Sequence, residues 1–429
     1  DDHDEDHDED HDEEFDFMSY DFFDSFERDI DTRTVDLRFR SNVKNNNKVD
    51  YVFGLYNSNY EETTDAAGYV FGGSATGLST GYDIISKSLY GELAFNFENS
   101  STLSVGFRHE ARDIDYFDFD NPSASFDLDG NWNTSYKVAY EMHPASNLHW
   151  YIYAAEGYHP AGVNQNPYLD MEDKTYDDEI YIDVTTGIRW YTDNIKLSTS
   201  LFYLEHDGHI FETSEQLDPS NPNAFAFFKQ NADSGYEYGS ETSGEFKLND
   251  RFSMGLSLGL MSSEIEFGDH AEHGDEHGED DHDEDHDEDH DEDHDEDHDE
   301  DHDEDHDDHG DDHDDHGGHE GHAEHGQKAH APNWNYSLTF NYNFTEDSSL
   351  MVEIAGKDAF IFDSQNDSYE SDPYHLLNAY YSHSFNKIRL GVYAKNILDE
   401  SYADRGFIFG LEPPHFHEKL YKSFGPPRE

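Results

Sequence analysis

The sequence predicts an all-β protein, and more narrowly an antiparallel up-and-down β-barrel that spans a membrane. Three observations lead to this fold class. Apolar and polar residues alternate along most of the chain, short and long connections also alternate, and no run of about 18 apolar residues could form a transmembrane helix. Strands of this kind present one face to lipid and the other to a polar lumen.

The segment 179–190 illustrates the alternation. One side carries Ile180, Ile182, Val184, Ile188 and Trp190, and the other carries Glu179, Tyr181, Asp183, Thr185 and Arg189. Strict alternation over about ten residues is typical of a strand with two different faces. The same pattern predicts strands at 32–41, 49–60, 86–97, 102–115, 131–142, 147–158, 178–191, 195–209, 224–247, 251–267, 333–344, 348–362, 374–384 and 387–397.

The connections between these strands are of two kinds. Short polar turns are expected at 98–101, 143–146, 192–194, 248–250, 343–347 and 385–386. Long connections are expected at 61–85, 116–130, 159–177, 210–223, 268–332, 363–373 and from 398 onward. Because the two kinds alternate, all long connections lie at one end of the sheet. Bacterial outer-membrane barrels have this asymmetry, whereas a soluble sandwich does not need it.

Composition excludes several classes of function. The chain of 429 residues has 101 Asp and Glu against 25 Lys and Arg, so its formal charge of −76 excludes nucleic-acid binding. It has no cysteine, which excludes disulfides, thiol nucleophiles and cysteine-based zinc sites. No nucleophile elbow, His-Glu-x-x-His motif or phosphate loop is present. We therefore expect neither an enzyme nor a required cofactor.

The acidic residues divide the chain into segments. Residues 1–31 form an acidic, His-rich segment, and 32–429 form the barrel region, which 268–330 interrupts with a second Asp/Glu/His-rich run. Such runs cannot bury a core, so we expect disordered, solvated loops there.

The histidines of the second run are candidate metal ligands. A repeat of one His and Asp-Glu-Asp contains His282, His286, His290, His294, His298, His302 and His306, and a close pair, His415 and His417, follows near the end of the chain. Imidazole and carboxylate groups suit zinc, nickel, copper or manganese, which such a loop would bind loosely at high local concentration. A perfect tetrapeptide repeat is also what replication slippage produces, so an inert acidic loop is the alternative. Strand parity predicts that these residues, His206 and His209 lie on the extracellular side.

Several motifs are more specific than the alternation. Asn396, Leu398, Asp399 and Tyr402 precede Arg405-Gly406-Phe407, and Gly157–Asn164 and Asn231-Ala232 with Gly235 and Glu237 lie upstream. In these motifs the chain resembles TonB-dependent outer-membrane receptors. Thr185 and Pro426 depart from the family pattern, which has Glu and Asp there.

The resemblance implies a place in the outer membrane of a Gram-negative bacterium, in contact with lipid. Members of the family close at about 22 strands around a plug, and with about 14 predicted strands and no plug this chain is expected to be a fragment of such a barrel. Coupling to the TonB complex would use the missing N-terminal region.

The implied function is import of a scarce metal ion such as zinc, or of a metal chelate such as a ferric siderophore. The alternatives are a passive porin-like channel and a metal-buffering surface protein.

Overall fold

The computed structural model describes residues 24–42, 48–68, 78–128, 130–166, 169–216, 225–267, 325–409 and 419–428. These residues form β-strands and a short 3-10 turn at Pro122–Ala124. None of the helical structure in this part of the chain is long and apolar enough to cross a membrane.

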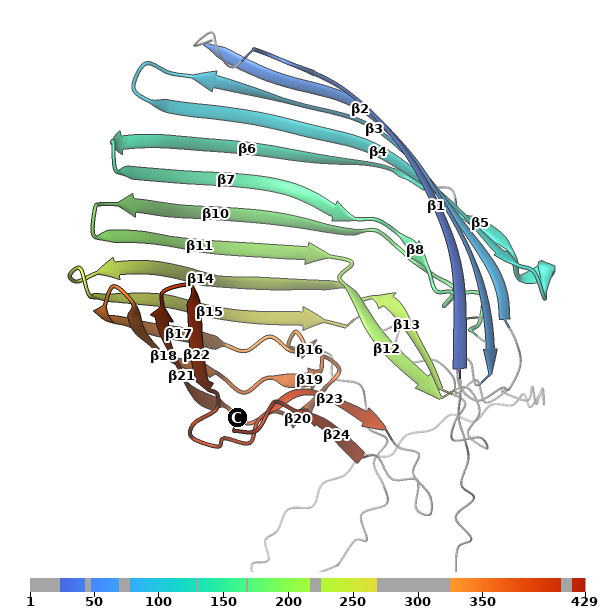
Figure 1. Cartoon of the computed structure of the whole chain (residues 1–429). Coiled ribbons are helices and arrows are strands. Elements are labelled where there is room, and N and C mark those ends of the chain that lie inside the picture. Colours follow the sequence, from blue (N-terminus) through green and yellow to red (C-terminus); the bar gives the residue numbers. More distant parts are fainter. Residues whose placement is uncertain are drawn as a thin grey trace, which may run out of the picture. The chain divides into compact units, whose positions relative to one another are not determined.

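Fourteen strands follow one another in one antiparallel path (Figure 1). They are β1 (Asp24–Arg40), β2 (Val49–Gly68), β3 (Leu78–Asn96), β4 (Ser101–Asp118), β6 (Trp132–Ala145), β7 (Leu148–His159), β10 (Glu179–Tyr191), β11 (Ile195–Asp207), β14 (Ser234–Lys247), β15 (Phe252–Glu266), β17 (Trp334–Thr345), β18 (Ser348–Lys357), β21 (Tyr374–Phe385) and β22 (Ile388–Ala394). The path begins at β1 and ends at β22, and no pairing of described residues joins these two strands. The predicted all-β meander is confirmed.

The first hairpins extend further than the alternation predicts. Strand β1 begins at Asp24 and pairs there with Gly68, although residues 24–31 were assigned to the acidic segment. Strand β3 begins at Leu78 rather than at residue 86. Both extensions carry polar residues on both faces, so the sequence pattern ends there. The backbone hydrogen bonds of the ladder continue because they do not depend on side-chain polarity.

The single strand predicted at 224–247 is wrong, because the chain changes partner within it. β13 (Phe225–Asn231) pairs with β12 (Ile210–Gln216), in a region predicted to be a loop, and β14 begins only at Ser234. At the break, the Ala232 N–H donates to the His209 carbonyl at 2.7 Å, and the Asp233 N–H to the Glu266 carbonyl at 3.0 Å. The alternation cannot reveal such a change, because both strands have the same period.

Further short strands lie in the long connections. β5 (Phe126–Leu128) and β16 (His325–Gly326) join the main sheet, beside β4 and β15. Small hairpins are formed by β8 (Gly162–Val163) with β9 (Thr175–Tyr176), β19 (Ile361–Asp363) with β20 (Asn366–Glu370), and β23 (Ala403–Phe409) with β24 (Lys419–Phe424). The predicted strand 348–362 is therefore also two elements, β18 and β19.

One face of the main sheet is apolar and exposed. In register, Val184 lies beside Ala154, Ala154 beside Val138, and Val138 beside Val105. The exposed fractions are 40% for Val184, 49% for Val138 and 43% for Val105. No second layer of described residues covers this row, whereas a water-soluble sheet would bury it.

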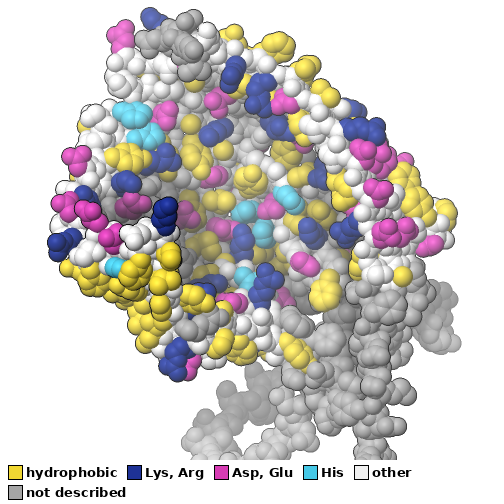
Figure 2. Space-filling view, viewed as in Figure 1, with side chains coloured by type: hydrophobic (Ala, Val, Ile, Leu, Met, Phe, Trp, Pro, Cys, Tyr) yellow, Lys and Arg dark blue, Asp and Glu magenta, His cyan; other side chains and the backbone are white. Residues whose placement is uncertain are grey.

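The other face is polar. Arg108 pairs with Glu110, the Tyr153 hydroxyl donates to Asp183 Oδ2 at 2.8 Å, and Lys137 lies over the Tyr153 ring at 5.1 Å. Figure 2 shows Lys, Arg, Asp, Glu and His side chains interspersed in the hollowed part of the molecule. These two faces have the character expected of a lipid side and a lumen side.

Candidate metal centre

Three side chains meet where β10, β11 and β12 adjoin, at the end of the sheet that carries the long connections. Tyr181 lies opposite His206 in the β10–β11 ladder, so their side chains share a face. Glu179, the first residue of β10, is two residues before Tyr181 and therefore projects from the same face. His209 immediately precedes β12. Glu179 precedes His206 by 27 positions and His209 by 30 positions, and the antiparallel register brings the three residues together.

The Glu179 carboxylate is shared by both imidazoles. Its Oε1 lies 2.6 Å from His206 Nδ1 and 2.8 Å from His209 Nδ1, and its Oε2 accepts the Ile210 N–H at 3.4 Å. The two rings have centroids 5.1 Å apart. The side chains of Glu179 and His206 are 10% exposed and that of His209 is 12% exposed. We call Glu179, His206 and His209 the β10–β12 centre.

A glycine turn sets the approach of His209. Gly208 has φ +67°, a conformation that is unfavourable for any residue with a side chain. Its N–H donates to the Asp233 carbonyl at 2.9 Å. The Asn231 side chain fixes this turn to the preceding connection, because its Nδ2 donates to the Gly208 carbonyl at 2.8 Å and its Oδ1 accepts the Asp177 N–H at 2.7 Å.

The ladder places the centre beyond the length of a membrane span. A strand needs about 9–11 residues to cross a bilayer, and Glu179 and His206 lie past that length when counted from the short turn at Thr192–Asn194. The centre therefore belongs to the region of the long connections.

The charges of the centre stabilise one another. Burial alone would lower the pKa of His206, but the hydrogen bond with Glu179 and the negative charges of Glu179 and Glu237 raise this pKa to about 9. Burial alone would raise the pKa of the Glu179 carboxyl, and the hydrogen bonds with His206 and His209 more than offset it, so its pKa is lowered. At neutral pH the centre holds a carboxylate and at least one proton on an imidazole.

A second carboxylate faces the other nitrogen of His206. Glu237 Oε1 lies 3.6 Å from His206 Nε2 and 2.5 Å from Lys328 Nζ. His206 Nε2 is fully buried and has no hydrogen-bond partner among the described residues. Lys328 follows β16, and its N–H donates to Ser263 Oγ at 3.1 Å. His206 thus lies between two carboxylates, one of which is neutralised by a lysine.

The donor set fits a metal ion. The ligand atoms of Glu179, His206 and His209 all lie within 4.8 Å of one another. Among the described residues, no other group of three His, Asp or Glu side chains lies so close together. Two imidazoles and one carboxylate are a common protein ligand set for zinc.

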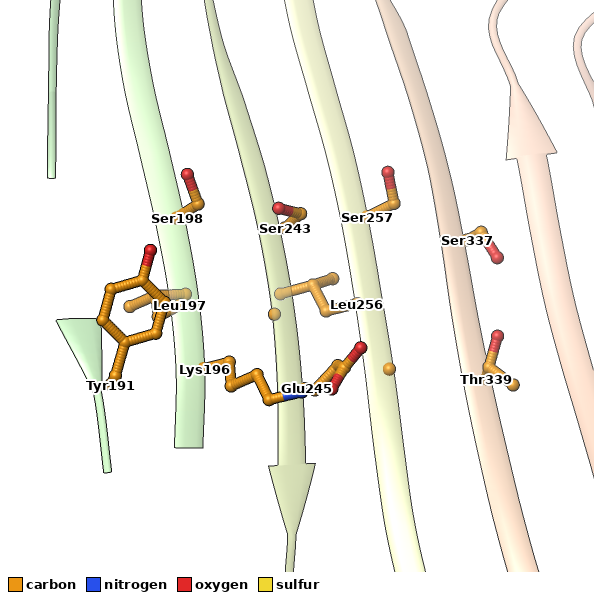
Figure 3. A pocket seen from close by; sticks show the side chains of 12 residues that line it. Tyr191, Lys196, Leu197, Ser198, Ser243, Glu245, Leu256, Ser257, Ser337 and Thr339 are labelled. Carbon is orange, nitrogen blue, oxygen red and sulfur yellow. Dashed lines mark hydrogen bonds and ion pairs between the residues drawn. The ribbon is translucent and has the colours of Figure 1, made fainter. Parts of the chain in front are cut away.

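A depression lies elsewhere on the sheet. It has a volume of about 330 Å³ and crosses β11, β14, β15 and β17 (Figure 3). Its lining includes a row of four serines in register, Ser198, Ser243, Ser257 and Ser337. Lys196 Nζ pairs with Glu245 Oε2 there at 2.8 Å. Its lining also includes Leu197, Leu256 and Tyr191, and no imidazole.

The sequence also predicts other candidate ligands. His282, His286, His290, His294, His298, His302 and His306, and also His415 and His417, lie outside the described residues. They remain a prediction, as does disorder in the acidic runs. Strand parity predicts only that His206 and His209 lie on the side of the long connections, and the alternation predicts only a polar strand face for Glu179. The spacing His206-Asp-Gly-His209 was the available signal, because it puts two imidazoles on either side of a tight turn.

A sequence model of the family described as TonB dependent receptor-like, beta-barrel, matches residues 3–397. The chain belongs to this family. No curated protein matches it at a significant level. The resemblance noted in the sequence motifs is therefore confirmed.

Solved structures of similar fold include the ferric yersiniabactin uptake receptor FyuA from Yersinia pestis, with a TM-score of 0.63 and 16% identity over 96% of this chain and 54% of that one. The siderophore receptor PiuA from Acinetobacter baumannii has a TM-score of 0.62 and 13% identity, over 94% of this chain and 55% of that one. The copper transporter OprC has a TM-score of 0.61 and 12% identity, over 94% of this chain and 56% of that one. At these identities the likeness shows the fold. The receptor chain spans about half the length of these structures.

The residues that carry the family motifs hold connections in place. Asn231 fixes the Gly208 turn, as described above. Asn396 has φ +47°, and its Nδ2 donates to the Glu400 carbonyl at 2.8 Å. Glu237 is the exception, because this motif residue faces His206. The family motifs thus explain the shape of the long-connection end, while Glu179, His206 and His209 are outside them.

Proposed function

We propose that the chain is part of an outer-membrane, TonB-dependent transporter that imports a scarce metal ion or a metal chelate. The observation that carries this proposal is the family match over residues 3–397. The exposed apolar row across β4, β6, β7 and β10 supports it, because such a row is stable against lipid and not against water.

The proposal includes two partners besides the substrate. Outer-membrane lipid would cover the apolar face, and the TonB complex would supply energy from the inner membrane of a Gram-negative cell. We propose transport and not catalysis, since the family is one of receptors and the sequence carries no catalytic motif.

The substrate class is a metal in one of two forms. Proteins of similar fold are named for uptake of ferric yersiniabactin, for a siderophore and for copper. The Asp/His runs with His282 to His306, and the pair His415 and His417, favour a divalent ion, which they would collect near the cell surface by charge and loose ligation. Zinc is the ion that this donor set suits best.

Deletion of residues 269–322 tests this proposal. The deletion leaves β15 and β16 in place, so the receptor should still assemble in the outer membrane. Uptake of zinc, nickel or manganese at limiting concentration should fall several-fold, because the local concentration of ligands is lost. Uptake assays with radioactive metal would measure this. Unchanged uptake of all three metals would contradict the capture role.

A further inference from the structure

We infer that Glu179, His206 and His209 bind one divalent transition-metal ion through three protein ligands, with Glu237 orienting His206 and the remaining coordination position open to exchange. The inference names the form of the cargo and a site for it, and in that respect it rests on the proposed transport function. It concerns residues of the sheet and its turns, outside the acidic repeats.

The first support is the donor set and its geometry. Zinc bonds to imidazole nitrogen at about 2.0–2.1 Å and to carboxylate oxygen at about 2.0–2.2 Å, which separates neighbouring ligand atoms by about 3.4 Å in a tetrahedral site. The two Nδ1 atoms now lie 2.6 and 2.8 Å from Glu179 Oε1. An ion that replaces the shared protons requires the ligand atoms to separate by less than about 1 Å.

The second support is the far nitrogen of His206. A metal-bound histidine commonly donates its other ring N–H to a carboxylate, which fixes the tautomer and makes the ligating nitrogen more basic. Glu237 Oε1 is 3.6 Å from the buried Nε2 of His206, and Lys328 holds this carboxylate. A small movement of the His206 ring would complete this hydrogen bond. Without a metal, the same Nε2 has no partner among the described residues.

The charge of the centre suits an ion that must leave again. Once the imidazoles are neutral, the three ligands carry the single negative charge of Glu179, and Lys328 balances Glu237. A divalent ion is therefore attracted by the charge of Glu179 alone, because Lys328 neutralises Glu237. Structural zinc sites usually have four protein ligands, whereas sites that exchange a ligand have three. Three ligands at the long-connection end suit a cargo that arrives from outside and moves on.

The donor chemistry also narrows the ion. Imidazole favours zinc, copper, nickel and cobalt over magnesium, calcium and manganese, which prefer oxygen ligands. The chain contains no cysteine that would favour softer ions.

Cobalt(II) titration of the purified receptor in detergent would test the inference, because four-coordinate cobalt absorbs visible light strongly. The reference receptor and all variants would carry the 269–322 deletion, which removes the longer acidic run from each of them. His206→Ala and His209→Ala should each lower cobalt and zinc affinity by at least about 100-fold and remove the absorption band. Glu237→Gln should lower the affinity about 10- to 100-fold and keep the band.

Controls separate ligation from folding. The double variant His143→Ala/His149→Ala removes two histidines at the opposite end of the sheet and should bind cobalt normally. His209→Gln keeps a polar side chain at the turn but cannot ligate well, so it should assemble in the outer membrane and still lose binding. Wild-type affinity in His209→Gln and in His206→Ala would overturn the site.

Cell uptake distinguishes the site from the proposed function. Loss of cobalt binding together with lower zinc uptake in His209→Gln supports both. Cobalt binding that depends on His209, in a receptor that imports no metal, would contradict the transport proposal and leave the site. If His209→Gln changes neither cobalt binding nor metal import, the site is overturned and the transport proposal stands.

Discussion

Among the described residues, a group of two histidines and one glutamate lies at each end of the sheet. At the short-turn end, His149 Nε2 lies 3.1 Å from Glu141 Oε2, and His143 stacks on His149 with ring centroids 4.6 Å apart. At the long-connection end, Glu179 contacts both His206 and His209. The same residue types therefore form a stacked histidine pair with one glutamate contact at the short-turn end, and a triad around a shared carboxylate at the long-connection end.

Burial is the main difference between these groups. The Glu141 side chain is 48% exposed, whereas that of Glu179 is 10% exposed. An exposed ion pair contributes little free energy because water and salt screen it, whereas a buried carboxylate must be satisfied by its neighbours. Composition alone does not make a metal centre. It also requires a turn and a second strand that enclose the ligands.

Substitution of the two glutamates should give the largest difference between the groups. Glu179→Gln removes the charge that holds two imidazoles, and we expect it to lower the free energy of unfolding by about 2–4 kcal/mol. Glu141→Gln should lower it by less than about 1 kcal/mol. Urea unfolding in detergent, followed by tryptophan fluorescence, would measure both. Equal effects would contradict the distinction that burial makes.

Metal affinity should depend on pH at the buried group. The raised pKa of His206, about 9, means that this imidazole keeps its proton at neutral pH and that a metal must displace it. Cobalt affinity should therefore rise with pH, by up to about tenfold between pH 7 and 8. The His143→Ala/His149→Ala variant should show the same slope. If cobalt affinity does not rise with pH, or if the rise disappears in His143→Ala/His149→Ala, cobalt does not bind at His206.

The turn beside His209 should give the smallest effect. Gly208→Ala forces a side chain into a φ of +67° and toward the Asp178 carbonyl, 3.2 Å from the new Cβ. We expect the free energy of unfolding to fall by about 1 kcal/mol, measured by urea unfolding in detergent. Gly255→Ala is the matched control, because its nearest neighbour is Thr339 Cβ at an ordinary 3.6 Å. Similar losses in both variants would contradict a role of the turn.

Much of the fold could be predicted because strand periodicity is a local property. The segment that contains Ile182 and Val184 alternates over its whole length, and β10 has almost the predicted bounds. The segment 224–247 is predicted to be one strand, yet it contains a change of partner at Ala232 and Asp233. Side-chain alternation reports which face a residue occupies and carries no information about which strand lies beside it.

The sequence by itself determined the strand faces, the end of the sheet to which each connection belongs, and the family motifs. Only the tertiary structure decided that Glu179 shares its carboxylate with His206 and His209, because that contact needs the β10–β11 register and the positive φ of Gly208 together. The long acidic repeats dominate the histidine pattern of the sequence, whereas the centre consists of three residues that pairing between strands brings into contact. Ligand geometry depends on contacts between distant residues, and composition does not contain them.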